Sequence, residues 1–104
     1  MRGFTLVGAG RLGTVLAAAL ARRGWTPELI VDVDARAARE ARRAIGAGRA
    51  AVSVHASSRL GDVVLVAVPD SEIARAAAGL AASGVRWAGR TVLHTSGLQP
   101  ASVA

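Results

Sequence analysis

The sequence predicts an α/β fold in which a doubly wound parallel sheet of strand order 3-2-1-4-5 is the middle of three layers. Three observations predict it: short apolar runs alternate with segments of helical periodicity, capping residues separate them, and a glycine-rich turn joins the first run to the first helix. Strands that alternate with helices form parallel sheets, and right-handed crossovers leave few topologies. The 104 residues, 52% of them hydrophobic, predict one globular domain over residues 1–104.

The first half of the chain holds three expected strands and two expected helices. They are a strand at 3–8, a helix at 11–23, a strand at 28–33, a helix at 35–45 and a weak strand within 49–55 centred on Val52–Val54. Asp34 is placed to cap the second helix and Gly46 to end it. A polar connection at 56–61 follows.

The second half holds two more strands around a third helix. The apolar run 62–68 is the clearest strand of the chain, and Pro69 ends it. A helix is expected from Asp70 to about Ser83, with acidic residues in its first turn and its inward face formed by Ile73, Ala77 and Leu80. The fifth strand is expected at 90–94, and residues 98–104 form a short tail.

Three glycines join the first strand to the first helix. Gly8, Gly10 and Gly13 have the G-x-G-x-x-G spacing of a dinucleotide-binding turn. In such a turn the first glycine allows a tight bend, the second lets a pyrophosphate approach the backbone, and the third lets the helix pack closely on the strand. The helix N-terminus then binds the phosphates. With 12 glycines in the chain the spacing alone is a weak indicator, and a turn that merely needs small residues is the alternative.

The ends of the other strands supply further candidate residues, because ligands of such sheets bind beyond the carboxyl ends of the strands. Asp32 follows the second strand, slightly more than ~20 residues after the glycines, and its carboxylate is suited to both hydroxyls of an adenine ribose. Helix capping is the alternative role, but Asp34 fits it better. A carboxylate there favours NAD over NADP, although Arg36 or Arg11 could still hold a 2′-phosphate.

His94 and Ser96 at the end of the fifth strand invite a hydrolase interpretation. A nucleophile elbow and a group that orients His94 are not visible in the sequence, so a structural role for His94 is the preferred interpretation. His55 and His94 lack the clustered ligands of a zinc site. No metal site is predicted, and no catalytic acid or base is identified.

Composition excludes several classes of protein. All 13 basic residues are arginine, scattered along the chain and with few aromatic residues between them, so the net charge of +6 is interpreted as a solvated surface without nucleic-acid binding. The absence of cysteine excludes disulfides and thiolate chemistry and fits a cytoplasmic protein. Neither a signal peptide nor a transmembrane segment is expected, and no membrane partner.

Three motifs in this order carry a family resemblance: 8-GAGRLG-13, 66-VAVPDSEI-73 and 94-HTSG-97. Together they resemble the Rossmann-like NAD(P)-binding domain of the 6-phosphogluconate dehydrogenase and pyrroline-5-carboxylate reductase superfamily, and most of all a family of Rossmann-like oxidoreductases. The resemblance covers almost the entire chain. It implies that the glycine turn holds the pyrophosphate and that the "AVP" and "HTSG" segments border the cofactor and its nicotinamide.

The strand ends and the resemblance together nominate one cofactor site. Its candidate residues are Gly8, Ala9, Gly10, Arg11, Leu12, Gly13, Asp32, Ala67, Val68, Pro69, Thr95 and Ser96. In the relatives a C-terminal helical domain supplies substrate contacts and the usual dimer interface. The sequence lacks that domain, so either such a domain or a second copy of the chain is expected to cover the exposed apolar surface.

The expected function is that of the NAD- or NADP-binding domain of an oxidoreductase that transfers hydride to or from a small substrate. A non-catalytic nucleotide-binding or sensing module is the alternative. A third interpretation is a methyltransferase that binds its methyl donor at the glycine turn.

Overall fold

The structure is a computed structural model that describes residues 2–95. Five parallel strands form one sheet of order β3-β2-β1-β4-β5, which confirms the predicted topology. The strands are β1 (Gly3–Val7), β2 (Thr26–Val31), β3 (Arg49–Ala51), β4 (Val63–Val66) and β5 (Thr91–His94). The helices are α1 (Arg11–Arg22), α2 (Ala35–Ile45), the 3-10 turn η1 (Asp70–Glu72) and α3 (Ile73–Ala81).

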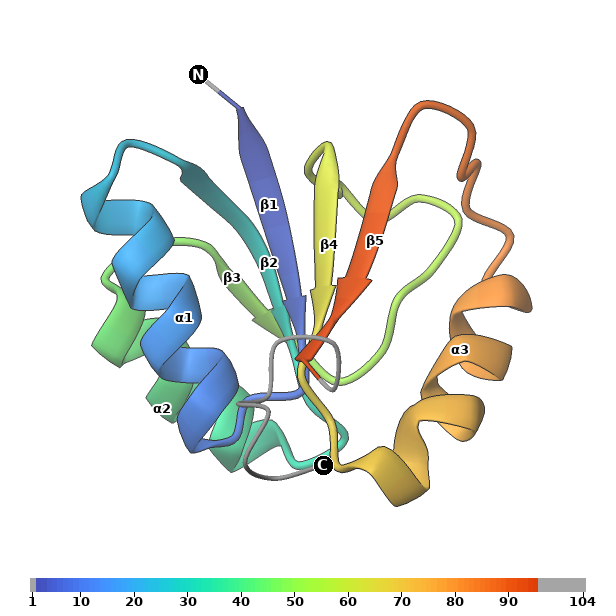
Figure 1. Cartoon of the computed structure of the whole chain (residues 1–104), viewed down its shortest axis with the longest axis horizontal. Helices are drawn as coiled ribbons and strands as arrows, with labels where there is room; N and C mark the ends of the chain where they lie inside the picture. The colour runs from blue at the N-terminus through green and yellow to red at the C-terminus, as the bar shows by residue number, and fades with distance from the viewer. Residues whose placement is uncertain (1, 96–104) are drawn as a thin grey trace, which may run out of the picture.

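Helices cover both faces of the sheet, as the right-handed crossovers require. α1 and α2 lie on one face and α3 lies on the other (Figure 1). On the first face, Phe4, Leu6 and Leu65 of the sheet pack with Ala17 of α1 and Ile45 of α2. This cluster is the larger of two buried cores, and its residues alternate along the strands with those that point to the opposite face.

The opposite face is more open. Its core cluster contains Leu29, Val31 and Leu60, with Val85 and Trp87 from the segment after α3 packed against it. No residue of α3 is buried. The helix has few large apolar side chains because alanine and glycine fill most of its sequence, so it cannot close the space between itself and the sheet. The indole Nε1–H of Trp87 donates to the carbonyl oxygen of Leu80 at 3.3 Å and ties the end of α3 to the following loop.

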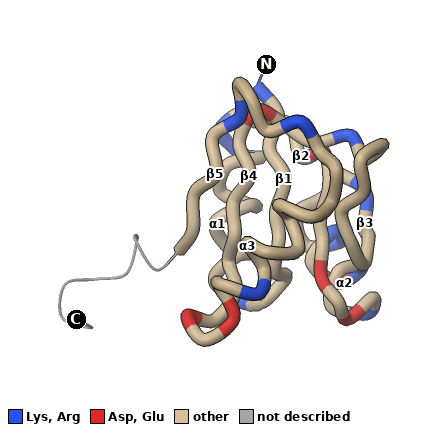
Figure 2. The backbone as a smooth tube through the Cα atoms, turned by 90° about the vertical axis from the view of Figure 1, so that its right-hand side faces the viewer, with Lys and Arg blue, Asp and Glu red and all other residues tan. Residues whose placement is uncertain are grey.

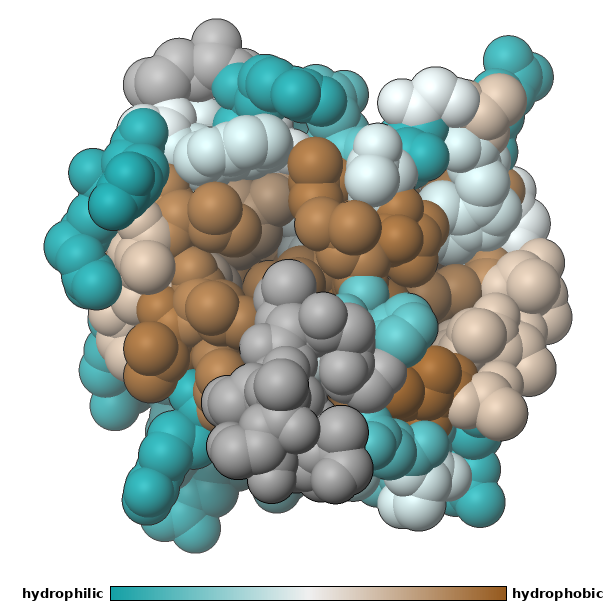
Figure 3. Space-filling model, viewed as in Figure 1, coloured by the Kyte–Doolittle hydropathy of each residue, from teal (hydrophilic) through white to brown (hydrophobic). Residues whose placement is uncertain are grey.

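β5 is exposed along its whole length. Leu93 pairs with Leu65 and therefore faces the side of α1, where it remains 47% exposed because no described helix covers β5 there. On the face viewed in Figure 1, hydrophobic residues form a broad area over α1 and toward β4 and β5 (Figure 3).

Several element boundaries differ from those expected. β2 begins and ends two residues earlier than the expected 28–33, and β4 is shorter than the expected 62–68. The third strand lies at Arg49–Ala51 and not around Val52–Val54, because its partner β2 ends at Val31, which pairs with Ala51. The Asp32 N–H then donates to the Ala51 carbonyl, and no strand residue remains beside Val52. The expected helix at 70–83 begins as a 3-10 turn and ends at Ala81. No helix within residues 2–95 is both long and apolar enough to cross a membrane.

Candidate functional site

The candidate residues that follow β1, β2 and β4 meet at the edge of the sheet formed by the carboxyl ends of these three neighbouring strands. This edge includes the switch point between β1 and β4, from which the chain leaves toward opposite faces. Acidic residues mark the turns after β2 and β4 there (Figure 2).

Packing within the protein requires two of the three glycines. Gly8 has a φ of 99°, and a Cβ on it would lie 2.6 Å from the carbonyl oxygen of Ala67. A Cβ on Gly13 would lie 2.7 Å from both the Gly8 oxygen and the Ala67 Cβ. Both contacts are shorter than van der Waals separation, so the turn and the close approach of α1 to β4 explain these two residues.

Gly10 has no such explanation. Its φ of −74° and ψ of −175° suit any residue, and a Cβ on it would meet no atom of the described residues within 4 Å. It occupies the N-cap position of α1 without a side-chain capping bond, and the first turn carries no acidic residue. The first amide N–H groups of α1, from Arg11 onward, have no acceptor within the helix. The space in front of Gly10 therefore faces the positive end of the α1 dipole.

Asp32 connects the end of β2 to the glycine turn. Its Oδ2 accepts a hydrogen bond from the Ala9 N–H at 2.8 Å, and its Oδ1 accepts one from the Asp34 N–H at 2.9 Å. The carboxylate is half-buried beside the turn. An ionised carboxylate has about four acceptor positions, so two backbone donors leave room for two more.

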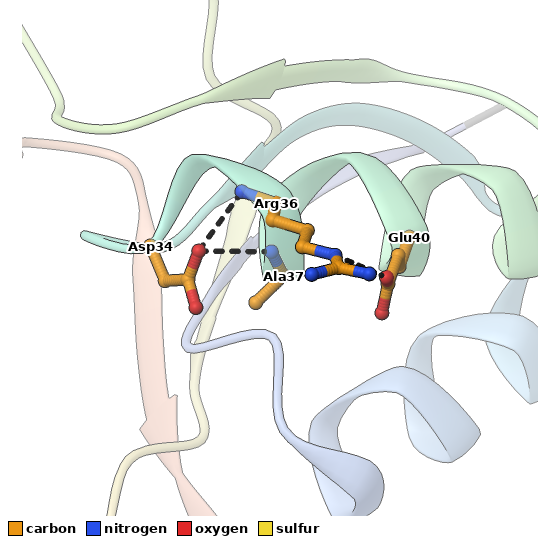
Figure 4. A network of polar contacts seen from close by, with 4 residues as sticks. All are labelled: Asp34, Arg36, Ala37 and Glu40. Carbon is orange, nitrogen blue, oxygen red and sulfur yellow. Dashed lines mark hydrogen bonds and ion pairs between the residues drawn. The ribbon is translucent and has the colours of Figure 1, made fainter.

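Asp34 caps α2, as predicted. Its Oδ1 accepts from the N–H groups of Arg36 at 2.9 Å and Ala37 at 3.4 Å (Figure 4). Arg36 in turn forms an exposed ion pair with Glu40, with 3.2 Å between Arg36 Nε and Glu40 Oε1. The structure thus assigns the capping role to Asp34, and the Asp32 carboxylate is not used for it.

A cleft of about 390 Å³ lies between these strand ends and α3. Among the predicted residues, Gly8, Asp32, Ala67, Val68 and Pro69 line it. Its volume falls in the range of about 300–1,000 Å³ typical of small-molecule sites. Ala9, Gly10 and Arg11 line a neighbouring groove between α1 and α2, and Leu12 is exposed beside it.

Sequence reasoning missed one wall of this cleft. Val33, Val52 and Val54 line it beyond β2 and β3, and α3 contributes Arg75 and Ala76. Arg75, Ala76 and Gly79 of α3 lie on one helical face, with Glu72 of η1 one turn before them, and this spacing is the pattern that identifies the wall.

The end of β5 lies farther from the cleft. Thr95 is buried, and His94 lines a second, apolar cavity of about 240 Å³ between α3 and β5. Ile73, Ala77 and Leu80, predicted to face inward, line this second cavity. Ser96 lies outside the described residues. Within residues 2–95, no group of three or more His, Asp or Glu side chains is arranged to hold a metal ion.

Comparisons with known proteins agree with this architecture. The family model of the Rossmann-like domain matches residues 3–103. A search of curated proteins found no match. A crystal structure from Bacteroides fragilis, named putative NADP oxidoreductase, is 27% identical with a TM-score of 0.79. The match covers 98% of this chain and 38% of that one, so this chain spans well under half of that relative's length. The chain belongs to the Rossmann-like domain family.

Proposed function

We propose that this chain binds a nicotinamide dinucleotide at the glycine turn and serves as the cofactor-binding domain of an oxidoreductase. The observation that carries the proposal is Gly10, whose missing Cβ is explained by no contact with residues 2–95. The absence of a side chain there lets a ligand reach the backbone N–H groups at the N-terminus of α1. The Rossmann-like family and the NADP oxidoreductase named among similar structures support the same assignment.

The amide groups at the start of α1 would hold the pyrophosphate. Backbone N–H donors and the helix dipole favour two negative charges at this point, and no acidic side chain in the first turn of α1 opposes them. Arg11 is exposed at the same end and adds a positive charge. Leu12 and Gly13 contribute through their backbones, and Ala9 stays bonded to Asp32.

Asp32 would bind the adenine ribose, since its carboxylate has acceptor capacity beyond its two backbone bonds. The adenosine would then occupy the cleft that Ala67, Val68 and Pro69 line on the β4 side. A 2′-phosphate would bring negative charge to the Asp32 carboxylate, so we propose NAD as the preferred cofactor. The relative's name points to NADP, and a comparison of the two cofactors decides between them.

When bound, the cofactor supplies a hydride donor or acceptor, and the protein supplies its position. The residues described here fix the adenosine and pyrophosphate, and thereby orient the remainder of the cofactor toward the end of β5. Thr95 and Ser96 are the proposed neighbours of the nicotinamide.

Titration with NADH, NADPH and S-adenosylmethionine tests the proposal. We expect saturable binding of NADH in the wild type and its loss in Gly10→Val, with the fold retained by circular dichroism. Ala44→Val is the control, because it adds a similar volume at an exposed position of α2 outside the cleft. Unchanged NADH affinity in Gly10→Val would refute the phosphate assignment, and binding of S-adenosylmethionine alone would favour a methyltransferase.

A further inference from the structure

The wall that α3 presents to the cleft has a distinct composition. Its cleft-facing positions are Arg75, Ala76 and Gly79 on one side of α3, and Glu72 at the end of η1 lies three and four residues before the first two of them. Ala76 and Gly79 are small, so they leave space in the cleft beside the longer side chain of Arg75. Of the described residues that line the cleft, Arg75 is the one with a basic side chain.

The guanidinium of Arg75 is available to a ligand. Within residues 2–95 the ion pairs involve Arg2 and Arg36, and no described hydrogen bond uses the Arg75 side chain. Arg75 is exposed at the rim of the cleft and lies on α3, whereas Asp32 lies at the sheet edge that forms the opposite wall.

The charged and apolar residues that line the cleft indicate which part of a bound ligand would contact Arg75. Asp32 and Glu72 supply carboxylates, which accept hydrogen bonds from hydroxyl groups and repel phosphate. The remaining lining is mainly apolar and includes the exposed side chains of Val33 and Val52. An apolar floor with a planar cation at its rim suits a flat, uncharged aromatic base.

Resting on the proposed function, we propose that Arg75 is a cofactor-binding residue that packs its guanidinium against the adenine base. The contact is a cation–π interaction between the planar guanidinium and the face of the base. It depends on the base and is independent of a 2′-phosphate. Arg75 therefore contributes equally to the binding of every ligand that carries the adenosine group.

Arg75→Ala tests this inference with NADH, NADPH and AMP as probes. We expect each affinity to fall by a similar factor, about 2- to 30-fold, as expected for loss of one cation–π contact. Arg75→Lys should recover part of the loss, since lysine keeps the charge without the plane. Arg39→Ala, which removes an exposed arginine from α2 away from the cleft, should leave all three affinities unchanged.

The outcomes separate this inference from the proposed function. A loss confined to NADPH would overturn the inference, because Arg75 would then bind the 2′-phosphate. Wild-type affinities in Arg75→Ala would also overturn it while leaving the dinucleotide site intact. Failure of the wild type to bind NADH and AMP would overturn both.

Discussion

Alanine at Gly10 should leave stability nearly unchanged and alanine at Gly13 should lower it, although the two residues lie only three positions apart in one motif. Within the part of the chain that the structure describes, an alanine Cβ at position 10 meets no atom within 4 Å. At position 13 it would lie 2.7 Å from the Gly8 oxygen and the Ala67 Cβ. The fold therefore tolerates a side chain at position 10 but not at position 13.

For Gly10→Ala, two effects on the free energy of unfolding nearly cancel. Alanine is a poorer N-cap than glycine, which costs about 0.5–1 kcal/mol. Alanine also reduces the conformational freedom of the unfolded chain, which contributes about 0.4–1 kcal/mol of stability. The net change should stay within about 0.6 kcal/mol, or less than about 5 °C in Tm for a domain of this size.

For Gly13→Ala, overpacking against a backbone oxygen that cannot move freely costs about 1–3 kcal/mol. The higher helix propensity of alanine offsets about 0.5–1 kcal/mol of this loss. A net loss of up to about 2.5 kcal/mol should lower Tm by up to about 20 °C.

Thermal unfolding followed by circular dichroism, together with NADH titration, measures both effects. The Gly10→Ala variant should keep the wild-type Tm and bind NADH about 10- to 150-fold more weakly, the equivalent of one charge-assisted hydrogen bond. If Gly10→Ala lowered Tm as far as Gly13→Ala does, a packing requirement would explain Gly10 and the reasoning would fail. Full NADH affinity in a stable Gly10→Ala protein would refute the placement of the pyrophosphate.

Three further substitutions test other parts of the structure. Asp34→Ala removes both capping bonds of α2 and should lower the free energy of unfolding by about 0.5–2 kcal/mol in urea titrations, with NADH affinity preserved; loss of binding would transfer the ribose role from Asp32 to Asp34. Asp32→Asn places an amide NH₂ where one backbone N–H now donates, so it should cost about 1–3 kcal/mol of stability and shift the ratio of NADH to NADPH affinity toward NADPH; an unchanged ratio would show that this carboxylate does not select the cofactor. Gly61→Ala would overlap the backbone of Gly3 and Phe4, so it should destabilise the protein by about 3 kcal/mol or more; a wild-type melting temperature would contradict the packing between the loop before β4 and the start of β1.

The sequence predicted the first and last residues of α2 well and those of β3 poorly, for a physical reason. Asp34 and Gly46 begin and end α2 through contacts within a few residues, which local sequence encodes. β3 is defined by its pairing with β2, and that pairing stops at Val31 and Ala51. The β propensity of Val52–Val54 could not override the end of the partner strand.

The candidate site shows the same division. The G-x-G-x-x-G spacing and the carboxylate after β2 were visible in the sequence because each belongs to one short segment. The distinct roles of the three glycines were not visible in the sequence. A side chain at Gly8 or Gly13 would collide with Ala67, which is more than 50 residues away along the chain, whereas one at Gly10 would not. Arg75 was missed because it belongs to the cleft only when α3 stands opposite the ends of β1 and β2.

The sequence by itself determined the order of the elements, the parallel sheet and the location of the phosphate turn, because local periodicity, capping residues and crossover handedness encode them. Tertiary structure alone decided which glycine is left to a ligand, how Asp32 divides its oxygens between the Ala9 and Asp34 amides, and which face of α3 forms the wall of the cleft. Each of these depends on distances between segments far apart in the chain, and such distances are fixed only when the sheet and its helices pack together.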